Sequence, residues 1–378
     1  MHREIFVNGR FLTQRTTGVQ RYALETLLAL DALLASGEAP QLKFTLLAPR
    51  GTQAPPLEHI QFRCAGTFSG NAWEQLSLPL LTRGSWLLSF GPTGPIAKKH
   101  QVVTMHDAAV YAVPRAFSWK FRAWYKALLP LLAHRIPLVM TVSEFSKSEL
   151  ARHCRIASER LRVAGGAWQH VRRLSSDASI LEEHGLRPNG YVLAVSSVTP
   201  HKNFGVIVDA ITRLAEIDVS VAVAGAVNHE VFGRTDLRSR KAVKLLGYVD
   251  DQQLRALYEG AAAFVYPSLY EGFGLPPLEA MALGCPVIAS NAASIPEICG
   301  DAVLYFPPRD ADALARAIER VVVDGRLRSE LIAKGRERIQ HFSWTACARQ
   351  HLDTFVQLDE RARAHEALPG KARGRAPA

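Results

Sequence analysis

The sequence has no uninterrupted apolar run of the roughly 20 residues that a membrane-spanning helix requires, although hydrophobic residues make up 48% of it. Its first residues, MHREIFVNGRF, also lack the basic flank, the apolar stretch and the small-residue cleavage site of a secretory signal. A transmembrane or secreted protein is therefore not expected. We expect a cytoplasmic protein, either soluble or peripheral on the inner face of the cell membrane.

Cysteine is scarce and irregularly placed, with five residues in a chain of 378. The cysteines are odd in number, and none is spaced as in a metal knuckle or a redox pair. Neither a disulfide framework nor a cysteine-bound metal is expected. We expect reduced thiols, mostly in the core, at Cys64, Cys154, Cys285, Cys299 and Cys347.

Acidic residues are few in the first half of the chain, which carries the whole basic excess of the protein. Residues 1–175 contain 22 Lys and Arg but 10 Asp and Glu. The remainder contains 23 Lys and Arg and 25 Asp and Glu, and the net charge of the whole chain is +10. This asymmetry indicates an anionic partner for the first half, such as a membrane surface, a phosphorylated acceptor or nucleic acid. A generally basic, solubilising surface explains it equally well.

Short apolar, β-branched runs alternate with amphipathic stretches of helical length along the chain, which is typical of parallel sheets flanked by helices. The length favours two domains. A polar stretch between Leu174 and Gly190 separates them, and we expect Rossmann-like, doubly wound α/β domains over 1–175 and 186–342. Residues 343–360 are expected to form a helix that packs back on the first domain, and the basic residues 361–378 a disordered tail.

The expected strands are IFVN, KFTLLA, SWLLSF, VVTMHD and PLVMTVS in the first domain, and YVLAVSS, VSVAVAGA, VKLLGYV, AAFVYPS, PVIAS and AVLYF in the second. Ligands of such sheets bind at the carboxyl ends of the strands. Two doubly wound domains leave a cleft between these ends. We therefore expect a site that both domains share.

The strongest local signal is the segment YEGFGLPPLEAMALG, which follows an expected strand. Gly272 and Gly274 let the backbone approach a ligand closely, and the two prolines fit the first turn of a helix that ends at the last glycine. The free amides and the positive end of this helix suit a pyrophosphate without a metal. Glu279, in the first turn, can present both carboxylate oxygens to the hydroxyls of a ribose. A preference of glutamate for helix N-termini explains Glu279, but neither Glu271 nor the glycines.

The spaced glutamates of EGFGLPPLEAMALG, with LGYV and PVIASN on either side, resemble the donor-binding motif of glycosyltransferase family 4. Five more segments extend the resemblance over nearly the whole chain: GVQRYA at Gly18, WEQLSLP at Trp73, HDAAVYAVP at His106, VSEFSKSEL at Val142 and TPHKN at Thr199. The resemblance implies the GT-B fold, with two Rossmann-like domains facing across a cleft. Among relatives, the chain looks most like the mannosyl- and rhamnosyltransferases of bacterial surface polysaccharide (O antigen) assembly.

This resemblance implies that the first domain takes the acceptor and that the second binds a nucleotide diphosphate sugar, the donor. Glu279 would hold the ribose, and Glu271 the hydroxyls of the donor sugar. The amides around Phe273, Gly274 and Leu275 would meet the phosphates. In the loop after the first strand of this domain, Lys202 would neutralise the diphosphate leaving group.

Further residues would complete the donor site by resemblance. Gly247 and Tyr248 would contact the nucleobase through their backbone. The amide of Gly18, at a helix start, would face the diphosphate from the first domain, although an ordinary helix-entry glycine explains it nearly as well. His106 would bond the donor sugar rather than act as a necessary base, with Asp107 beside it orienting the loop.

The sequence departs from the family pattern at two places. Most members have an arginine at the position of Ser197, and His201 is our candidate for the second donor of hydrogen bonds beside Lys202. A neutral His201 would make stabilisation of the leaving group weaker and pH-dependent. Many relatives have Asn-Gly where this chain has Gly165-Gly166, which leaves the role of the interdomain loop open.

Metal-dependent transfer usually involves paired aspartates. The spacing occurs here at Asp310 and Asp312, which precede an expected helix, and capping explains it. We therefore expect no required divalent metal and no cofactor. Retention of configuration is carried over from the family, in which the acceptor attacks on the face that the diphosphate leaves and a departing phosphate oxygen takes the proton. GDP-mannose is the donor that the resemblance suggests.

The segment FSWKFRAWYKALLPLLAHR, residues 117–135, mixes aromatic and basic side chains. Such a segment suits contact with an anionic membrane and a glycan or lipid-linked oligosaccharide acceptor. A helix that packs its aromatic side chains on the sheet is the alternative.

Two other classes of function stay open. An epimerase of the same fold would act on the nucleotide sugar without an acceptor. A non-catalytic protein would bind an anionic ligand or nucleic acid through the basic half alone. Against nucleic acid, the sequence contains no recognised binding module.

Overall fold

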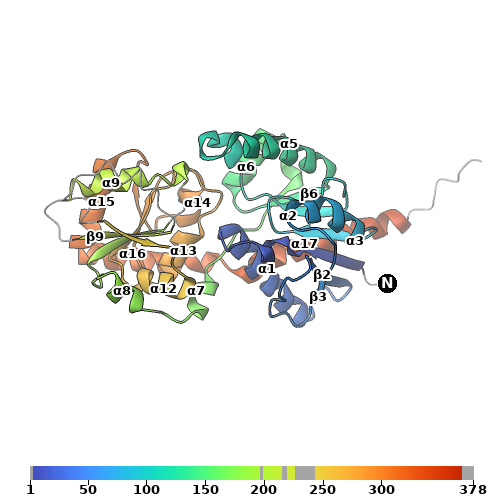
Figure 1. The fold of residues 1–378 in the computed structure, drawn as a ribbon, viewed down its shortest axis with the longest axis horizontal. Coiled ribbons are helices and arrows are strands. Elements are labelled where there is room, and N and C mark those ends of the chain that lie inside the picture. The colour runs from blue at the N-terminus through green and yellow to red at the C-terminus, as the bar shows by residue number, and fades with distance from the viewer. Residues whose placement is uncertain (1–2, 196–198, 215–218, 226–242, 368–378) are drawn as a thin grey trace, which may run out of the picture.

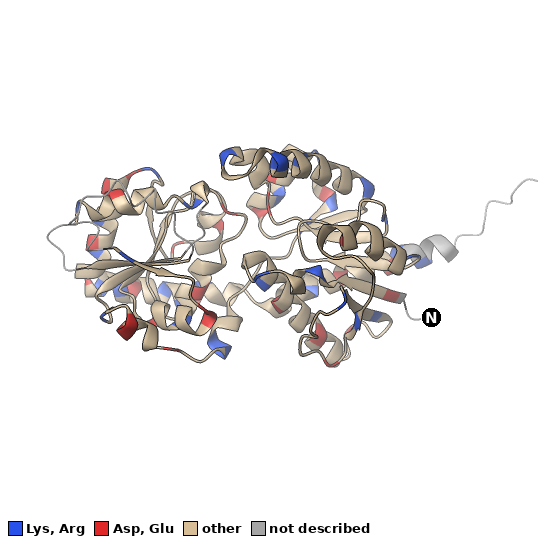
Figure 2. Ribbon diagram, in the orientation of Figure 1, with Lys and Arg blue, Asp and Glu red and all other residues tan. Residues whose placement is uncertain are grey.

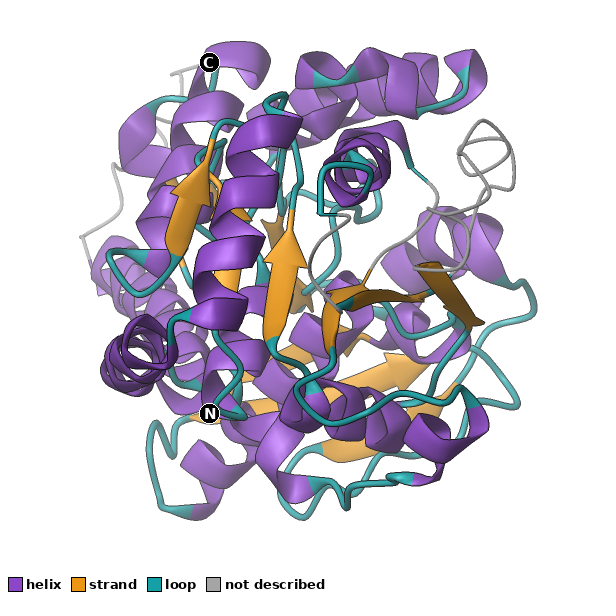
Figure 3. Cartoon of the chain, turned by 90° about the vertical axis from the view of Figure 1, so that its left-hand side faces the viewer, coloured by secondary structure: helices purple, strands orange, loops and turns teal. Residues whose placement is uncertain are grey.

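The chain folds into two lobes, each built on a parallel sheet with helices on both faces, in a computed structural model (Figures 1 and 3). The structure describes residues 3–195, 199–214, 219–225 and 243–367. Within these ranges the first sheet has seven strands and the second has six. The predicted α/β class with two doubly wound sheets is therefore confirmed.

The first sheet is formed by β1 (Arg3–Asn8), β2 (Leu42–Ala48), β3 (Gln61–Cys64), β4 (Trp86–Ser89), β5 (Gln101–Thr104), β6 (Leu138–Thr141) and β7 (Leu161–Val163). Its strand order is β3-β2-β1-β4-β5-β6-β7, and all neighbours pair in parallel. The order reverses between β1 and β4. The carboxyl ends of these two strands are therefore the switch point at which open α/β sheets bind ligands.

The second sheet is formed by β8 (Tyr191–Val195), β9 (Ser220–Ala224), β10 (Val243–Gly247), β11 (Ala263–Tyr266), β12 (Val287–Ser290) and β13 (Leu304–Phe306). Its order is β10-β9-β8-β11-β12-β13, again with parallel neighbours. The switch point here lies between β8 and β11. Lys202 follows the first of these strands and Glu271 the second, so both lie where a ligand is expected.

The helices that connect and cover these strands are α1 (Gly18–Ala35), α2 (Gly70–Ala72), α3 (Leu78–Leu81), α4 (Ala109–Ala112), α5 (Trp119–Arg135), α6 (Glu144–Cys154), α7 (Gln169–Arg173), α8 (Ser179–Glu183), α9 (Phe204–Ile211), α12 (Asp251–Gly260), α13 (Leu275–Ala282), α14 (Ile295–Cys299), α15 (Ala311–Val323), α16 (Gly325–Arg338) and α17 (Trp344–Ala367). Short 3-10 turns are η1 (Gly9–Thr13), η3 (Pro114–Ala116), η4 (Ser158–Arg160), η5 (Pro200–Lys202) and η6 (Ile339–His341), and η2 (Trp73–Ser77) is a π-helical turn.

All eleven predicted strands are present, whereas the sequence did not predict β3 and β7. Both lie at the edges of the first sheet. β3 is mostly exposed, with the residues QFRC, and β7 has three residues. Neither is long or apolar enough to give the pattern of a buried strand.

The first sheet ends at Val163, and the chain then crosses to the second lobe, where α7 packs on α13 and α8 on α12. The last helix, α17, returns to the first lobe and packs along α1 (Figure 1). Phe355 of α17 is buried there, with its ring centroid 6.1 Å from those of Phe44 and Trp86.

The helix α17 is longer than predicted. It continues through Ala367, so the first seven residues of the expected disordered tail are helical. Alanine and arginine are strong helix formers, and Arg363 forms an ion pair with Asp359 one turn earlier. Residues 368–378 lie outside the described part of the chain.

The cysteines behave as expected, since four of the five thiols are buried and unpaired, and Cys64 is exposed and unpaired.

Among the described residues, no helix has both the length and the hydropathy of a membrane span.

Candidate active site

The candidate site lies where the carboxyl ends of the two sheets face each other. A Cβ atom on Gly272, in the loop after β11, would lie 2.6 Å from the backbone oxygen of His106 and 2.9 Å from Cβ of Asp107. A larger residue would clash with the backbone of the first lobe at this point. The hydroxyls of Ser143 and Ser146 donate to the carbonyl oxygen of Gly272, at 2.6 and 2.9 Å. The two lobes therefore touch through the backbone of this loop.

Lys202 and Glu271 form an ion pair, with Nζ 2.6 Å from Oε1. The two loops that carry them are joined, because the backbone N–H of Leu269 donates to the carbonyl oxygen of His201 at 2.7 Å. Burial raises the pKa of the Glu271 carboxyl, but the charge and hydrogen bond of Lys202, with smaller contributions from Ser268 and Tyr266, together hold the pKa below its usual value. The site thus contains a charged carboxylate beside an ammonium group.

Glu279 is the fifth residue of α13, just past the first turn in which the sequence placed it. It is fixed by residues that the sequence did not single out. Its Oε1 lies 3.0 Å from Nε2 of His170, and its Oε2 accepts from the hydroxyl of Tyr258 at 3.4 Å. The indole N–H of Trp344 points at Nδ1 of His170, at 3.4 Å. Because an indole only donates, Nδ1 is the acceptor, and Nε2 carries the proton that bonds Glu279. Each carboxylate oxygen keeps a second lone pair for a ligand hydroxyl.

The helix N-termini of both lobes point into the site. α13 begins at Leu275 and has two prolines in its first turn, as predicted, after Gly274 with a φ of +112°. Gly18 is the first residue of α1, and a Cβ atom there would lie 4.0 Å from Cδ1 of Leu275. Phe273 is buried against the ring of Phe342, with centroids 5.8 Å apart. Two positive helix ends therefore approach each other across the cleft.

His106 follows β5 and is buried at the same edge. Its Nε2 lies 2.9 Å from the carbonyl oxygen of Phe90, which can only accept, so Nε2 carries the proton of the neutral ring. Burial lowers the pKa of His106 to about 4, with the Phe90 hydrogen bond opposing the shift. His106 is therefore neutral near pH 7, and its Nδ1 is available as a hydrogen-bond acceptor.

His106 packs against a polar cluster that joins α1 to α17. Its ring meets the ring of Tyr22 edge-on, with centroids 4.9 Å apart. The Tyr22 hydroxyl lies 2.9 Å from both the carbonyl oxygen of Ala164 and Nε2 of His351. Because the single proton of the Tyr22 hydroxyl goes to the Ala164 carbonyl, Nε2 of His351 must donate to the phenol oxygen. Burial, with a smaller contribution from His106, lowers the pKa of His351 to about 3.

Gly247 ends β10 with a φ of +69°, and Tyr248 beside it is two-thirds exposed. The guanidinium of Arg15, from the first lobe, lies 4.1 Å above the Tyr248 ring, and Arg21 of α1 forms an ion pair with Asp251. The sequence did not single out these two arginines, which touch the second lobe at the expected nucleobase side. They are visible in the sequence only as part of the basic excess.

The candidates in the loop after β8 are described in part. Ser197 lies outside the described residues. The His201 ring lies 6.3 Å from that of Phe117, nearly parallel to it. Burial, and then the charge of Lys202, lowers the pKa of His201. The neutral form of His201 is therefore favoured near pH 7, which is the form that would make stabilisation of the leaving group weaker.

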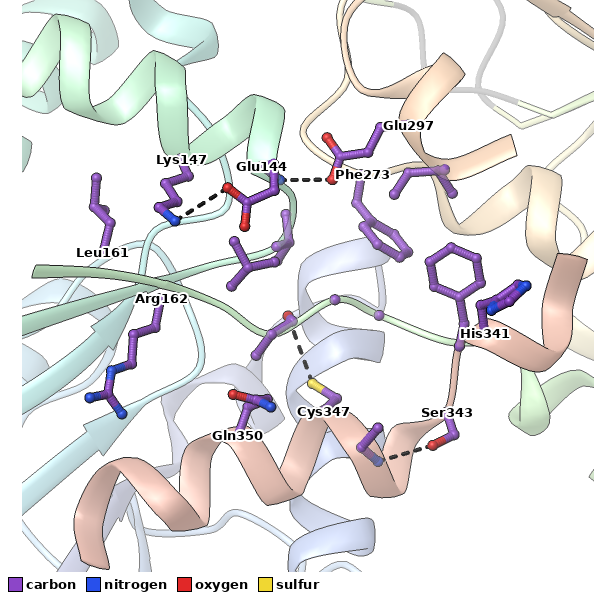
Figure 4. A pocket seen from close by; sticks show the side chains of 18 residues that line it. Glu144, Lys147, Leu161, Arg162, Phe273, Glu297, His341, Ser343, Cys347 and Gln350 are labelled. Atoms are coloured by element: carbon purple, nitrogen blue, oxygen red, sulfur yellow. Dashed lines mark hydrogen bonds and ion pairs between the residues drawn. The ribbon is translucent and has the colours of Figure 1, made fainter. Parts of the chain in front are cut away.

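A cavity of about 460 Å³ lies between the lobes next to the linker and α17 (Figure 4). At its rim the Glu297 carboxylate accepts from the first two backbone amides of α6, both at 2.8 Å. Gly165 and Gly166 line it, and a Cβ atom on either would lie 3.0–3.3 Å from the Phe273 ring. Its lining contains Phe273 but not Lys202, so this cavity is distinct from the ion pair.

Of the paired aspartates, Asp310 is the helix cap that the sequence predicted, whereas Asp312 is not a cap. Asp310 caps α15 by accepting from the backbone N–H of Ala313 at 2.8 Å, and Asp312 forms an ion pair with Arg213. Within the described ranges, no three His, Cys, Asp or Glu side chains gather as a metal site.

The segment 117–135 forms α5, and its aromatic side chains do not all pack on the sheet. Trp119 is 71% exposed, Phe121 is 40% and Trp124 is 46%. Lysines and arginines lie on the same helix at the edge of the first lobe (Figure 2). Tyr125 instead lines a pocket in the first lobe. The alternative of a helix with its aromatics buried is therefore wrong for three of these rings.

The buried neutral histidines predict a loss of stability in mild acid. Each folded-state pKa is below the ordinary value of about 6.5, so the unfolded chain binds more protons as the pH falls from 6.5 towards 4. The contribution is present above pH 6.5 and declines by up to about 1.4 kcal/mol per pH unit for each histidine. We expect the melting temperature to fall between pH 7 and 5, and to fall less in His351→Gln.

His59→Gln is the control for this experiment, because His59 is exposed. It should leave the pH dependence of the melting temperature unchanged. Equal slopes in His351→Gln and the unaltered protein would contradict the assignment.

Comparison with known proteins identifies the family of the chain. Residues 179–338 match the family described as glycosyl transferases group 1. O-antigen chain mannosyltransferase B of Escherichia coli is 32% identical over 372 residues, covering 90% of this chain and 96% of that protein.

Solved structures support the fold. Sucrose-phosphate synthase from Thermosynechococcus elongatus superimposes with a TM-score of 0.70 at 20% identity, covering 95% of this chain and all of that one. Anabaena HepE in complex with UDP-glucose gives a TM-score of 0.67 at 18% identity, covering 94% and 100%. The expected GT-B fold is confirmed, and the chain belongs to the group 1 glycosyltransferases.

Proposed function

We propose that this glycosyltransferase transfers mannose from GDP-mannose, with retention of configuration, to a glycan or lipid-linked oligosaccharide during O-antigen assembly. The observation that carries the proposal is the ion pair of Lys202 and Glu271 at the switch point of the second sheet. The choice of mannose is supported by the similarity to an O-antigen chain mannosyltransferase. The epimerase alternative is less favoured, because that relative transfers its sugar.

In this proposal the second lobe binds the donor and the first lobe binds the acceptor. The diphosphate lies between the N-termini of α13 and α1, where the amides after Gly274 and at Gly18 carry positive partial charge. The ribose hydroxyls bond Glu279, which His170 and Tyr258 hold in position. The nucleobase lies beside Gly247 and Tyr248.

The reaction then needs little covalent chemistry from the protein. The bond between the sugar carbon and the diphosphate oxygen breaks, the acceptor oxygen bonds to that carbon on the same face, and the acceptor proton goes to the departing phosphate oxygen. Lys202 exchanges Glu271 for the diphosphate and stabilises the developing charge. Glu271 and the Nδ1 atom of His106 accept hydrogen bonds from the sugar hydroxyls. The helix ends supply positive charge, so we propose that no divalent metal and no cofactor are required.

Ligand-induced stabilisation tests the donor site. A ligand at 100 times its Kd stabilises by about 2.7 kcal/mol, so GDP should raise the melting temperature in EDTA, and magnesium should add nothing. UDP, dTDP and ADP in the same panel test the choice of base. No shift with any diphosphate, or a shift that needs magnesium, would contradict the proposed site.

Substitution of the ion pair tests the chemistry. Lys202→Ala removes the positive charge at the leaving group and should lower kcat by about 10²–10³, the usual effect of losing one such group. Glu271→Ala should abolish transfer. Lys334→Ala is the matched control, because Lys334 forms its ion pair with Asp301 on the surface. Full transfer of mannose in Lys202→Ala and Glu271→Ala would exclude this assignment.

We also propose that α5 rests on an anionic membrane surface, which would bring a lipid-linked acceptor to the first lobe. The exposed rings of Trp119 and Trp124 suit the membrane interface, and the neighbouring Lys120, Arg122 and Lys126 suit its negative charge.

Vesicle sedimentation tests this contact. The protein should bind vesicles that contain phosphatidylglycerol more than vesicles of phosphatidylcholine alone, and the double variant Trp119→Ser, Trp124→Ser should bind severalfold less. Val323→Ser, which removes an exposed apolar residue of the second lobe, should bind as the unaltered protein does. Equal binding of the double variant would contradict the role of α5.

A further inference from the structure

A second cavity, of about 160 Å³, opens at the switch point of the first sheet. Asn8 at the end of β1 and Gly91 just after β4 line it. Gly91 follows Phe90, whose carbonyl oxygen binds His106, so the cavity lies next to the candidate active site. An apolar cavity of about 150 Å³ holds one benzene molecule, so this one has room for a single six-membered ring.

The floor of this cavity contains a buried ion pair. The Glu74 residue is 2% exposed, and its Oε2 lies 3.1 Å from Nε of Arg10 and accepts from Nδ2 of Asn8 at 3.0 Å. Among the described residues, Oε1 accepts one long hydrogen bond, from Nε2 of Gln75 at 3.4 Å. Burying a carboxylate is costly unless it is fully bonded. Glu74 therefore retains an oxygen that can accept from a ligand hydroxyl.

The segment WEQLSLP, which no part of the proposed donor site uses, builds the cavity. Its first five residues form the π-helical turn η2, a form of helix that is rare and often found at functional sites. The Trp73 indole is buried and donates to the carbonyl oxygen of Ala65 at 2.7 Å. The Gln75 side chain donates to the carbonyl oxygen of Gly94 and accepts from the N–H of Ile96, at 2.9 and 3.0 Å. The turn thus fixes Glu74 and the loop after β4 together.

The lining matches an uncharged sugar. The charges of Arg10 and Glu74 offset each other, so the cavity has no free positive charge for a phosphate or a carboxylate. The hydroxyl of Thr93 accepts from Arg10 and keeps its own proton to donate. The amide of Gln20 donates to that of Gln14, whose own N–H groups can donate further. The half-buried Tyr125 adds an aromatic wall.

We propose that this cavity binds one uncharged monosaccharide ring, the terminal sugar of the acceptor, with Glu74 and Arg10 bonding neighbouring hydroxyls. The inference rests on the proposed transferase function and assigns the site at which the acceptor sugar binds. It also explains why a charged pair is retained in the core of the first lobe, beside the loop that carries His106.

Saturation-transfer NMR with a panel of uncharged methyl glycosides, of mannose, rhamnose, galactose and N-acetylglucosamine, tests the proposal in the presence of GDP. We expect saturation-transfer signals from at least one glycoside. The 6-phosphate of that glycoside should give signals that are no stronger. Glu74→Gln should weaken binding at least tenfold. Gly91→Leu should do the same by filling the cavity, and it should fold, because a Cβ atom at Gly91 has no neighbour within 4 Å.

Matched controls separate the cavity from general damage. Asp31→Asn alters another buried carboxylate of the first lobe, and Gly325→Leu adds the same side chain to open space in the second. Both should bind the glycoside as the unaltered protein does, and every variant should retain the thermal shift with GDP. If the unaltered protein binds GDP but no glycoside, or if Glu74→Gln and Gly91→Leu bind glycoside normally, the acceptor cavity is wrong. A protein that binds no diphosphate would instead overturn the proposed function.

Discussion

The close approach of the loop after β11 to the first lobe is the constraint on which the site depends. The absent side chain at Gly272 lets this loop reach the backbone at His106 and the hydroxyls of Ser143 and Ser146. Glu271 precedes this contact directly, and the N-terminus of α13 follows it. The contact therefore fixes the positions of the two glutamates relative to the strand ends of the first lobe.

Other contacts between the lobes surround this point. Glu297 bonds the amides at the start of α6, so a carboxylate of the second lobe meets the positive end of a helix of the first. Elsewhere, Arg15 lies over the ring of Tyr248, and Arg21 pairs with Asp251, the first residue of α12. These polar contacts are individually weak where they are exposed. They add to the buried apolar contacts at Phe273 and Leu275 in specifying one relative position of the lobes.

The rule that parallel strands gather their following loops at one edge of the sheet predicted a ligand site at the strand ends, but it did not predict the ion pair found there. Lys202 and Glu271 are far apart in the chain, yet they follow neighbouring strands of the second sheet, and the structure brings them together. The rule says nothing about His170 or Tyr258, which reach Glu279 from helices. These contacts depend on how helices pack, which the spacing of residues in one sequence does not reveal. The roles in donor binding stay predictions.

The basic excess of the first half is divided among different tasks, which a net charge cannot separate. Arg10 offsets a buried carboxylate, Arg15 and Arg21 contact the second lobe, and the charges of α5 lie on the surface. Most of the charges of α5 are exposed, as are other basic residues of this half such as Arg63 and Arg83. A single polyanion-binding face would need these charges on one exposed surface. The placement of Arg10, Arg15 and Arg21 therefore argues against a protein that binds nucleic acid through the whole of its basic half.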